Sequence, residues 1–184
     1  MEEGDLILRS KEGDLDAFNQ LVEKYQREVY NLARRMLGEA PAAEDATQEA
    51  FISAFRGIGK FRGGNFRAWL LSIVANACRD QMRFWRRRPT TSLDALVLEP
   101  EADRDAQSPE DYALRRELGE KIANALATLP ADQRLAVILY DIEGLSYEEI
   151  AQVMNSSLGT VRSRLSRARA RLRQYLGQRM ELLP

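Results

Sequence analysis

The segment near the carboxyl end of the chain combines arginines with small hydrogen-bonding side chains. Six arginines lie between residues 158 and 173, and one face of this segment carries serine, threonine and arginine side chains. A helix that lies in the major groove of DNA needs such groups, because they reach the base edges without excess bulk. The residues predicted to contact bases are Thr160, Arg162, Ser163, Ser166 and Arg167.

The residues before this segment predict the elements that position it. Ser146 and Glu149 have the spacing of a capping box, and Leu145 and Ile150 stand at the positions of a hydrophobic staple. A short helix should therefore begin at Ser146, and residues 155–157 then supply turn and capping chemistry. A second, longer helix is predicted from an apolar stripe at Leu158, Val161, Leu165, Ala168 and Leu172.

An amphipathic helix can also be rich in arginine merely because its solvated face is charged. Here the capping box, the turn and the spacing of the two helices agree with the charge pattern, so together they favour a DNA-binding helix-turn-helix. The motif alone would fit a simple repressor equally well.

A second basic region lies in residues 61–90, which hold seven basic residues and one acidic residue. Its polar residues recur at helical spacing beside aromatic residues, an arrangement suited to backbone phosphates and unstacked bases. Phe66 and Trp69 are expected to be mostly core, so the contacts should come from the preceding loop and the polar stripe. The predicted residues are Lys60, Arg62, Asn65, Asn76, Arg79 and Arg83.

The helix predicted between about Pro41 and Ile58 carries a third surface. One face of this helix is apolar. Another face carries an aliphatic side chain surrounded by two acidic residues and an amide, as in a protein-binding patch. A solvated face with one stray isoleucine is an equal alternative, and periodicity does not distinguish the two. The residues of this patch are Asp45, Gln48, Glu49 and Ile52.

The composition disfavours several classes of protein. The chain has no histidine and one cysteine, Cys78, so the commonest general base, a zinc site and an internal disulfide are missing. We expect no catalytic residue, no metal and no cofactor. The amino terminus is acidic rather than a basic-then-apolar signal, and no apolar run approaches the length of a membrane span. These features predict a cytoplasmic protein without membrane insertion.

Helical periodicity recurs along the chain without a credible strand, which predicts an all-α fold. Two small helical domains are expected, over residues 1–88 and 111–184. Residues 89–110 contain three prolines and many acids without a sustained period, so they should form an extended, mobile, acidic linker. The two basic regions therefore fall in different domains, which suggests two separate contacts with a polyanion.

Four motifs in this order resemble the bacterial RNA polymerase sigma factors of the extracytoplasmic-function group. They are D-A-T-Q-E-A-F at 45–51, F-R-A-W-L-L-S-I-V-A-N at 66–76, L-P-A-D-Q-R at 129–134, and the helix-turn-helix motifs G-L-S-Y-E-E-I-A at 144–151 and G-T-V-R-S-R-L-S-R-A-R at 159–169. The resemblance covers nearly the whole chain, and only the linker is unmatched in detail.

The resemblance implies a transcription initiation factor without an enzymatic site. The first domain is similar to sigma region 2, which docks on the largest polymerase subunit and opens the minus-10 element. Asp45, Gln48 and Glu49 fall on the docking positions of the family, which favours the patch over a solvated face. The loop 60–66 and Asn76 fall on positions that capture a flipped non-template base.

The second domain is similar to sigma region 4, which reads the minus-35 element in the major groove. Arg162, Ser163, Ser166 and Arg167 occupy the reading positions of the family. Members are commonly held inactive by an anti-sigma protein, often in a stress or envelope response. The expected partners are core RNA polymerase, promoter DNA and an anti-sigma factor, and the free protein is expected to be a monomer.

Two other classes remain as alternatives. A free-standing repressor would explain residues 144–173, but it would leave the other two surfaces unused and would normally bind a palindrome as a dimer. An enzyme acting on nucleic acid is disfavoured, because the sequence shows no histidine, cysteine cluster or carboxylate pair at metal spacing.

Overall fold

The computed structural model of the chain describes residues 2–87 and 109–180, and these residues form helices and loops without a strand. The predicted all-α fold is confirmed. The first half of the chain contains α1 (Glu3–Lys11), α2 (Leu15–Leu37), α3 (Ala40–Gly57), the short 3-10 helix η1 (Ile58–Lys60) and α4 (Phe66–Arg87). The second half contains α5 (Pro109–Ala127), α6 (Ala131–Val137), the π-helical turn η2 (Ile138–Ile142), α7 (Tyr147–Val153) and α8 (Leu158–Met180).

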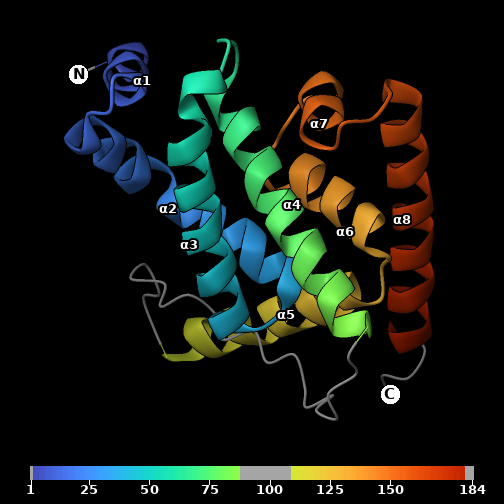
Figure 1. Cartoon of the computed structure of the whole chain (residues 1–184). Coiled ribbons are helices and arrows are strands. Elements are labelled where there is room, and N and C mark those ends of the chain that lie inside the picture. The colour runs from blue at the N-terminus through green and yellow to red at the C-terminus, as the bar shows by residue number, and fades with distance from the viewer. Residues whose placement is uncertain (1, 88–108, 181–184) are drawn as a thin grey trace.

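The first half is a bundle in which α2, α3 and α4 pack against one another, with α1 against α2 (Figure 1). The apolar stripe of α2 is buried, and aromatic rings fill the end of the bundle near η1. Phe61 and Phe66 meet edge to face with their centroids 5.5 Å apart, and Trp69 packs on both. These rings fix the start of α4. Their packing agrees with the prediction that Phe66 and Trp69 belong mostly to the core.

The second half contains the predicted helix-turn-helix, formed by α7 and α8. Ser146 caps α7 as expected: its Oγ accepts from the Glu149 N–H at 3.2 Å, and the Glu149 carboxylate accepts from the Ser146 N–H at 2.8 Å. Ser157 caps α8, because its Oγ accepts from the Thr160 N–H at 3.2 Å. Both predicted helix starts are therefore confirmed.

The apolar stripe predicted for α8 is wrong at one position. Val161, Leu165 and Ala168 are buried, but Leu158 is 37% exposed. Leu158 is the first residue of the helix.

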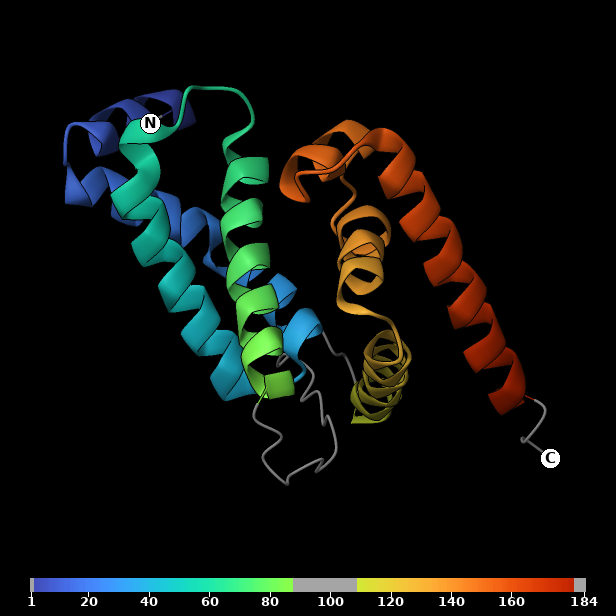
Figure 2. The ribbon, with the colours of Figure 1, turned by 45° about the vertical axis from the view of Figure 1, so that its right-hand side comes forward.

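The two halves lie against each other along α4, which packs on α6 and α7, while α5 contacts both α2 and α8 (Figure 2). Arg134 of α6 is central to this packing. Its buried guanidinium donates to the carbonyl oxygens of Met36 at 2.5 Å and Ala127 at 2.9 Å, and burial lowers its pKa. One cation thus joins the end of α2 to the end of α5.

The predicted linker, residues 89–110, lies almost entirely outside the described residues. Its last two residues do not belong to a linker, because α5 begins at Pro109. Proline is well suited to the first position of a helix, since the amide hydrogen it lacks would have no partner there.

Candidate nucleic-acid and protein interfaces

The predicted base-reading residues of α8 are mostly open to solvent. Arg162, Ser166 and Arg167 are exposed, whereas Thr160 and Ser163 are half-buried. The Ser163 hydroxyl donates to the Thr160 carbonyl at 3.0 Å, and the Thr160 hydroxyl lies 2.9 Å from the Ser157 Oγ. The outer face of α8 therefore presents two arginines and one serine without a carboxylate partner among the described residues.

The predicted minus-10 residues before α4 surround a pocket of about 390 Å³. Gly63 and Gly64 both have positive φ, near +94° and +93°, which a residue with a side chain would adopt only under strain. They turn the chain so that Asn65 can cap α4, with its Oδ1 accepting from the Ala68 N–H at 3.0 Å. Lys60 and Arg62 line the same pocket, and both are exposed.

A residue of the second half closes one side of this pocket. Gln152 of α7 lines it together with the loop residues. The Asn65 amide also donates to the Glu149 carboxylate at 2.5 Å, so the caps of α4 and α7 are joined by one hydrogen bond. The pKa of Glu149 is lowered, chiefly by its hydrogen bond from the Ser146 backbone and also by nearby cationic and amide groups. The ionised carboxylate, which accepts these hydrogen bonds, is therefore favoured.

One residue of the polar stripe of α4, Arg79, is also bonded to the second half. Asp132 of α6 accepts from Arg79 of α4, 3.1 Å away, and from Arg164 of α8, 2.8 Å away. The Arg79 side chain is only 15% exposed as a result. Asn76 and Arg83 remain exposed, with Arg83 3.5 Å from Asp80 on the same helix.

A third connection between the halves centres on Glu143, in the turn between η2 and α7. Its carboxylate lies 3.2 Å from Arg35 of α2 and 3.7 Å from Arg67 of α4, and its carbonyl accepts from Arg67 at 2.9 Å. Burial raises the pKa of Glu143 against the opposing effect of the arginines. We use the term seam contacts for the bonds of Asp132, Glu143 and Glu149 to the first half.

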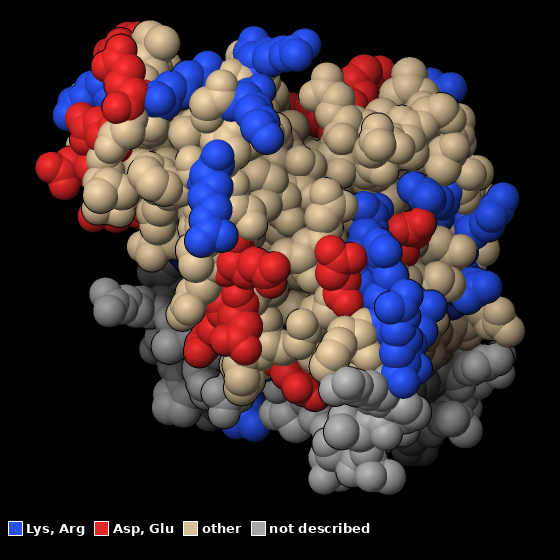
Figure 3. Space-filling view, in the orientation of Figure 1, with Lys and Arg blue, Asp and Glu red and all other residues tan. Residues whose placement is uncertain are grey.

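The predicted docking patch on α3 is exposed in all of its members. Asp45, Gln48 and Glu49 are exposed, and the side chain of Ile52 is 51% exposed. Figure 3 shows acidic side chains gathered over the lower part of α3, with basic ones farther right, toward α8. The seam contacts do not involve this patch, so it is open while the two halves are packed together.

Sequence reasoning did not assign a role to Asp132, Glu143 or Arg134. The L-P-A-D-Q-R motif contains Asp132 and Arg134 and was the only sequence signal that pointed to them. Their partners, Arg79 and Met36, lie 53 and 98 residues away in the sequence. Among the described residues no cluster of histidine, cysteine, aspartate and glutamate could hold a metal ion. The same residues include no helix long and apolar enough to cross a membrane.

Comparison with known proteins identifies the family. Residues 21–88 match the family described as Sigma-70 region 2, and residues 119–172 match Sigma-70, region 4. The RNA polymerase sigma-H factor of Pseudomonas aeruginosa is 42% identical over 170 residues, 89% of this chain and 88% of that protein. The ECF RNA polymerase sigma-E factor of Escherichia coli K12 is 40% identical over 172 residues, with the same coverage of 89% and 88%.

Solved structures show the same fold. CnrH, in complex with the cytosolic domain of CnrY, superposes with a TM-score of 0.69 at 27% identity, covering 94% of this chain and 96% of CnrH. The sigma factor RpoE of Bartonella quintana, in complex with the anti-sigma factor NepR, gives a TM-score of 0.70 at 28% identity, covering 89% of this chain and 98% of RpoE. The chain therefore belongs to the extracytoplasmic-function sigma factors of RNA polymerase, which are transcription initiation factors and not enzymes.

Proposed function

We propose that this sigma factor directs core RNA polymerase to its promoters through three surfaces. Residues 1–88 form the domain that docks on polymerase through the α3 patch and opens the minus-10 element through the loop before α4 and the stripe Asn76, Arg79 and Arg83. The second domain, which begins with α5 at Pro109, reads the minus-35 element through the outer face of α8. Tethering both domains to one polymerase raises their effective concentration at properly spaced elements, so specificity depends on sequence and spacing together.

The observation that carries the mechanism is the pairing of predicted minus-10 residues with the second half. Asn65 is bonded to Glu149 and Arg79 to Asp132, so these two side chains must give up a partner in the second half to bind DNA, whereas the other four predicted minus-10 residues are exposed. The bonds of Asn65 and Arg79 to the second half would then break when the minus-10 element is bound. We infer that docking of the open α3 patch on polymerase comes first and that separation of the two domains follows.

The closed arrangement also suggests how the factor is controlled. CnrH and RpoE of Bartonella quintana are both described in complexes, the latter with an anti-sigma factor. An anti-sigma protein that prefers the closed arrangement would hold this chain inactive until a stress or envelope signal releases it. Such a partner can shift the equilibrium only by its difference in affinity for the two arrangements. The free protein is proposed to be a cytoplasmic monomer.

The docking step is tested by truncating the polar rim of the α3 patch. Gln48→Ala with Glu49→Ala should lower the affinity for core polymerase about tenfold, because the two side chains border the exposed Ile52. The matched control is Gln20→Ala with Glu23→Ala, which removes the same two residue types from an exposed part of α2.

The affinity is measured by titrating labelled core polymerase with each full-length variant, and circular dichroism checks the fold. Loss of affinity in the patch variant but not in the control supports the proposal. An unchanged affinity of the patch variant, or an equal loss in both, would place docking elsewhere.

A further inference from the structure

Two tyrosines of the second domain form a stacked pair beside α8. Tyr140 belongs to η2 and Tyr147 is the first residue of α7, and their rings lie nearly parallel, 11° apart with centroids separated by 5.0 Å. A hydrogen bond with Tyr140 raises the pKa of Tyr147, so the hydroxyl groups as well as the rings are close. The pair therefore joins the turn before the helix-turn-helix to its first helix.

Each ring of this pair meets one arginine of α8. The Arg162 guanidinium carbon lies 5.7 Å from the ring centroid of Tyr147, and that of Arg169 lies 5.0 Å from the ring centroid of Tyr140. These distances fall within the range of cation–π attraction. Arg162 and Arg169 are seven residues apart, two helical turns, so both project from one side of α8.

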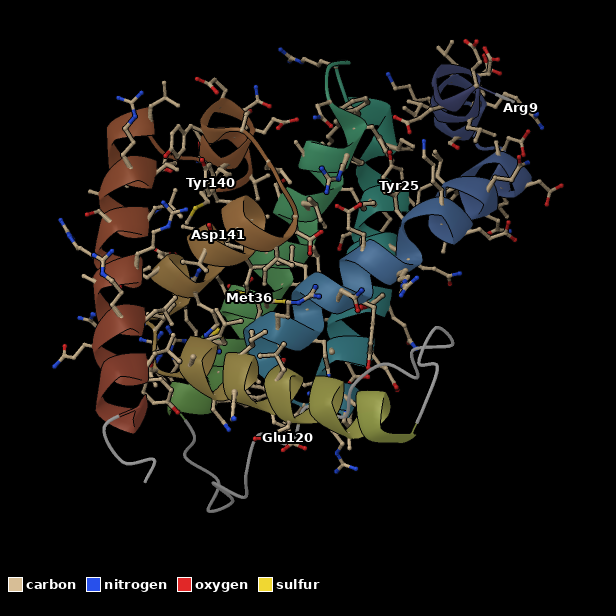
Figure 4. All side chains as sticks on the ribbon, turned by 180° about the vertical axis from the view of Figure 1, so that it is seen from behind. Arg9, Tyr25, Met36, Glu120, Tyr140 and Asp141 are labelled. Carbon is tan, nitrogen blue, oxygen red and sulfur yellow. The ribbon has the colours of Figure 1, made fainter. Side chains whose placement is uncertain are left out.

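The far end of this arrangement is anchored by a carboxylate. Arg169 donates to the Asp141 Oδ1 at 2.6 Å, and this bond raises the pKa of Arg169. Figure 4 shows Tyr140 and Asp141 on neighbouring positions of the helix beside α8. Asp141 thus fixes Arg169, Arg169 covers Tyr140, and Tyr140 supports Tyr147 beneath Arg162.

Arg162 differs from Arg169 in the contact that holds it. Arg162 is exposed and makes no ion pair among the described residues. A cation–π contact uses the flat face of a guanidinium, whereas its hydrogen-bond donors point outward in the plane. The ring of Tyr147 can therefore restrict the rotamers of Arg162 and leave all of its donors available, which a carboxylate partner would not.

We propose that Tyr147 is a positioning residue for minus-35 recognition, which orients Arg162 for DNA before binding. Tyr140 is its support, and the Arg169–Asp141 pair holds the support in place. The proposal rests on the proposed role of Arg162 in DNA contact. Pre-orientation improves affinity because less side-chain freedom is lost when the complex forms.

Ring contact and hydroxyl contact are separated by two substitutions of Tyr147. Tyr147→Phe keeps the ring and loses the hydroxyl, while Tyr147→Leu keeps apolar bulk and loses the π face. Holoenzyme reconstituted with each full-length variant is titrated with a promoter duplex selected by the parent holoenzyme from a random pool. Tyr147→Leu should weaken binding about two- to fivefold and Tyr147→Phe less than twofold, as expected for an exposed cation–π contact.

A double-mutant cycle shows whether Tyr147 acts through Arg162. In an Arg162→Ala background, Tyr147→Leu should have little further effect, because the group it orients is gone. In an Arg173→Ala background, which removes another exposed arginine of α8, the full effect of Tyr147→Leu should remain. Equal losses in both backgrounds, or a Tyr147→Phe variant as weak as Tyr147→Leu, would overturn the positioning role.

A measurement without DNA tests whether Tyr147 orients Arg162 independently of whether Arg162 contacts DNA. Nitrogen-15 relaxation of the arginine side chains in the full chain should show a restricted Arg162 Nε–H in the parent and in Tyr147→Phe, and a mobile one in Tyr147→Leu. An equally mobile Arg162 in all three proteins would refute the positioning. A restricted Arg162 whose replacement by alanine leaves DNA binding unchanged would refute the assigned DNA contact instead.

Discussion

The two helices with predicted DNA contacts, α4 and α8, differ in what their polar faces meet. On α8, Arg162, Ser166 and Arg167 face solvent, and Asp132 and Asp141 pair with other arginines of the same helix. On α4 and the loop before it, Arg79 and Asn65 are bonded to the other domain. The predicted DNA contacts of α8 therefore have no partner among the described residues of the first domain, whereas two of the six predicted near α4 are bonded to the second domain.

We propose that this difference gives an order to promoter binding. The predicted minus-35 surface would be available in the closed arrangement, whereas full use of the predicted minus-10 surface would require Asn65 and Arg79 to leave their partners in the second domain. The seam contacts are ion pairs and hydrogen bonds, each worth about 1 kcal/mol, but the buried Arg134 and one continuous hydrophobic core also hold the two halves together. We propose that docking on polymerase supplies the free energy that separates the two halves and that the free protein stays closed.

The largest expected effect comes from the buried cation that joins the two halves. Arg134→Ala leaves the carbonyl groups of Met36 and Ala127 without their charged donor, so it should lower the free energy of unfolding by roughly 2 to 4 kcal/mol. Arg116→Ala, which breaks an exposed pair with Glu120 on α5, should cost less than about 0.5 kcal/mol. Urea denaturation of both variants measures the difference. Equal stabilities would show that the packing of the halves does not depend on Arg134.

The next effect tests the open surface of α8. Arg167→Ala should cost about 1 to 3 kcal/mol on the preferred minus-35 sequence and narrow the gap to mismatched sequences, as a base-edge contact would. Arg171→Ala, farther from the start of the helix, should weaken binding to all sequences alike and reduce its salt dependence. Titration of matched and mismatched duplexes at two salt concentrations separates the roles. A uniform loss for Arg167→Ala would reassign it to the phosphate backbone.

A smaller effect is expected on α4, at Asn76. Asn76 itself is exposed. Its amide can pair with an extruded base but adds little attraction to duplex DNA, so Asn76→Ala should leave the closed complex nearly intact and reduce open complex about fivefold, roughly the worth of one hydrogen bond. Permanganate footprinting of unpaired thymines, beside a binding assay on the same promoter, measures both stages. Normal opening by this variant would leave base capture to the loop 60–65.

The smallest effect is a gain. Asp132→Ala breaks the ion pairs to both Arg79 and Arg164, so the free protein should bind a single-stranded minus-10 probe about two- to fivefold more tightly. Glu120→Ala removes the same charge from a pair within α5 and should give no such gain. Fluorescence anisotropy with both variants makes the comparison. An equal gain in the control would reflect net charge rather than release of Arg79.

The sequence predicted the helix starts of this fold well, because capping signals are local. Ser146 and Glu149 are three residues apart, and Pro41 stands in the first turn of α3. The pairing of Arg79 with Asp132 could not be predicted in the same way. Helical periodicity shows which side of a helix is polar, but it does not show whether that side meets solvent or another domain.

The exposed α3 patch also shows that periodicity does not identify what a polar face binds. Periodicity placed Ile52 on the polar face, and the structure confirms its exposure, but exposure alone does not identify a partner. The residue roles assigned to this patch, to the minus-10 residues and to the outer face of α8 stay predictions until variants are measured.

We propose that the free protein is closed and that docking on polymerase separates the domains. Spin labels at Gln26→Cys on α2 and Gln174→Cys on α8 report the separation, since both positions are exposed and outside the predicted contacts. Cys78 is buried and burial raises the pKa of its thiol to about 12, so it should escape labelling. Pulsed electron resonance should give one narrow distance in the free protein and a longer one in the complex with core polymerase. A broad distribution in the free protein, or an unchanged distance after docking, would contradict the claim.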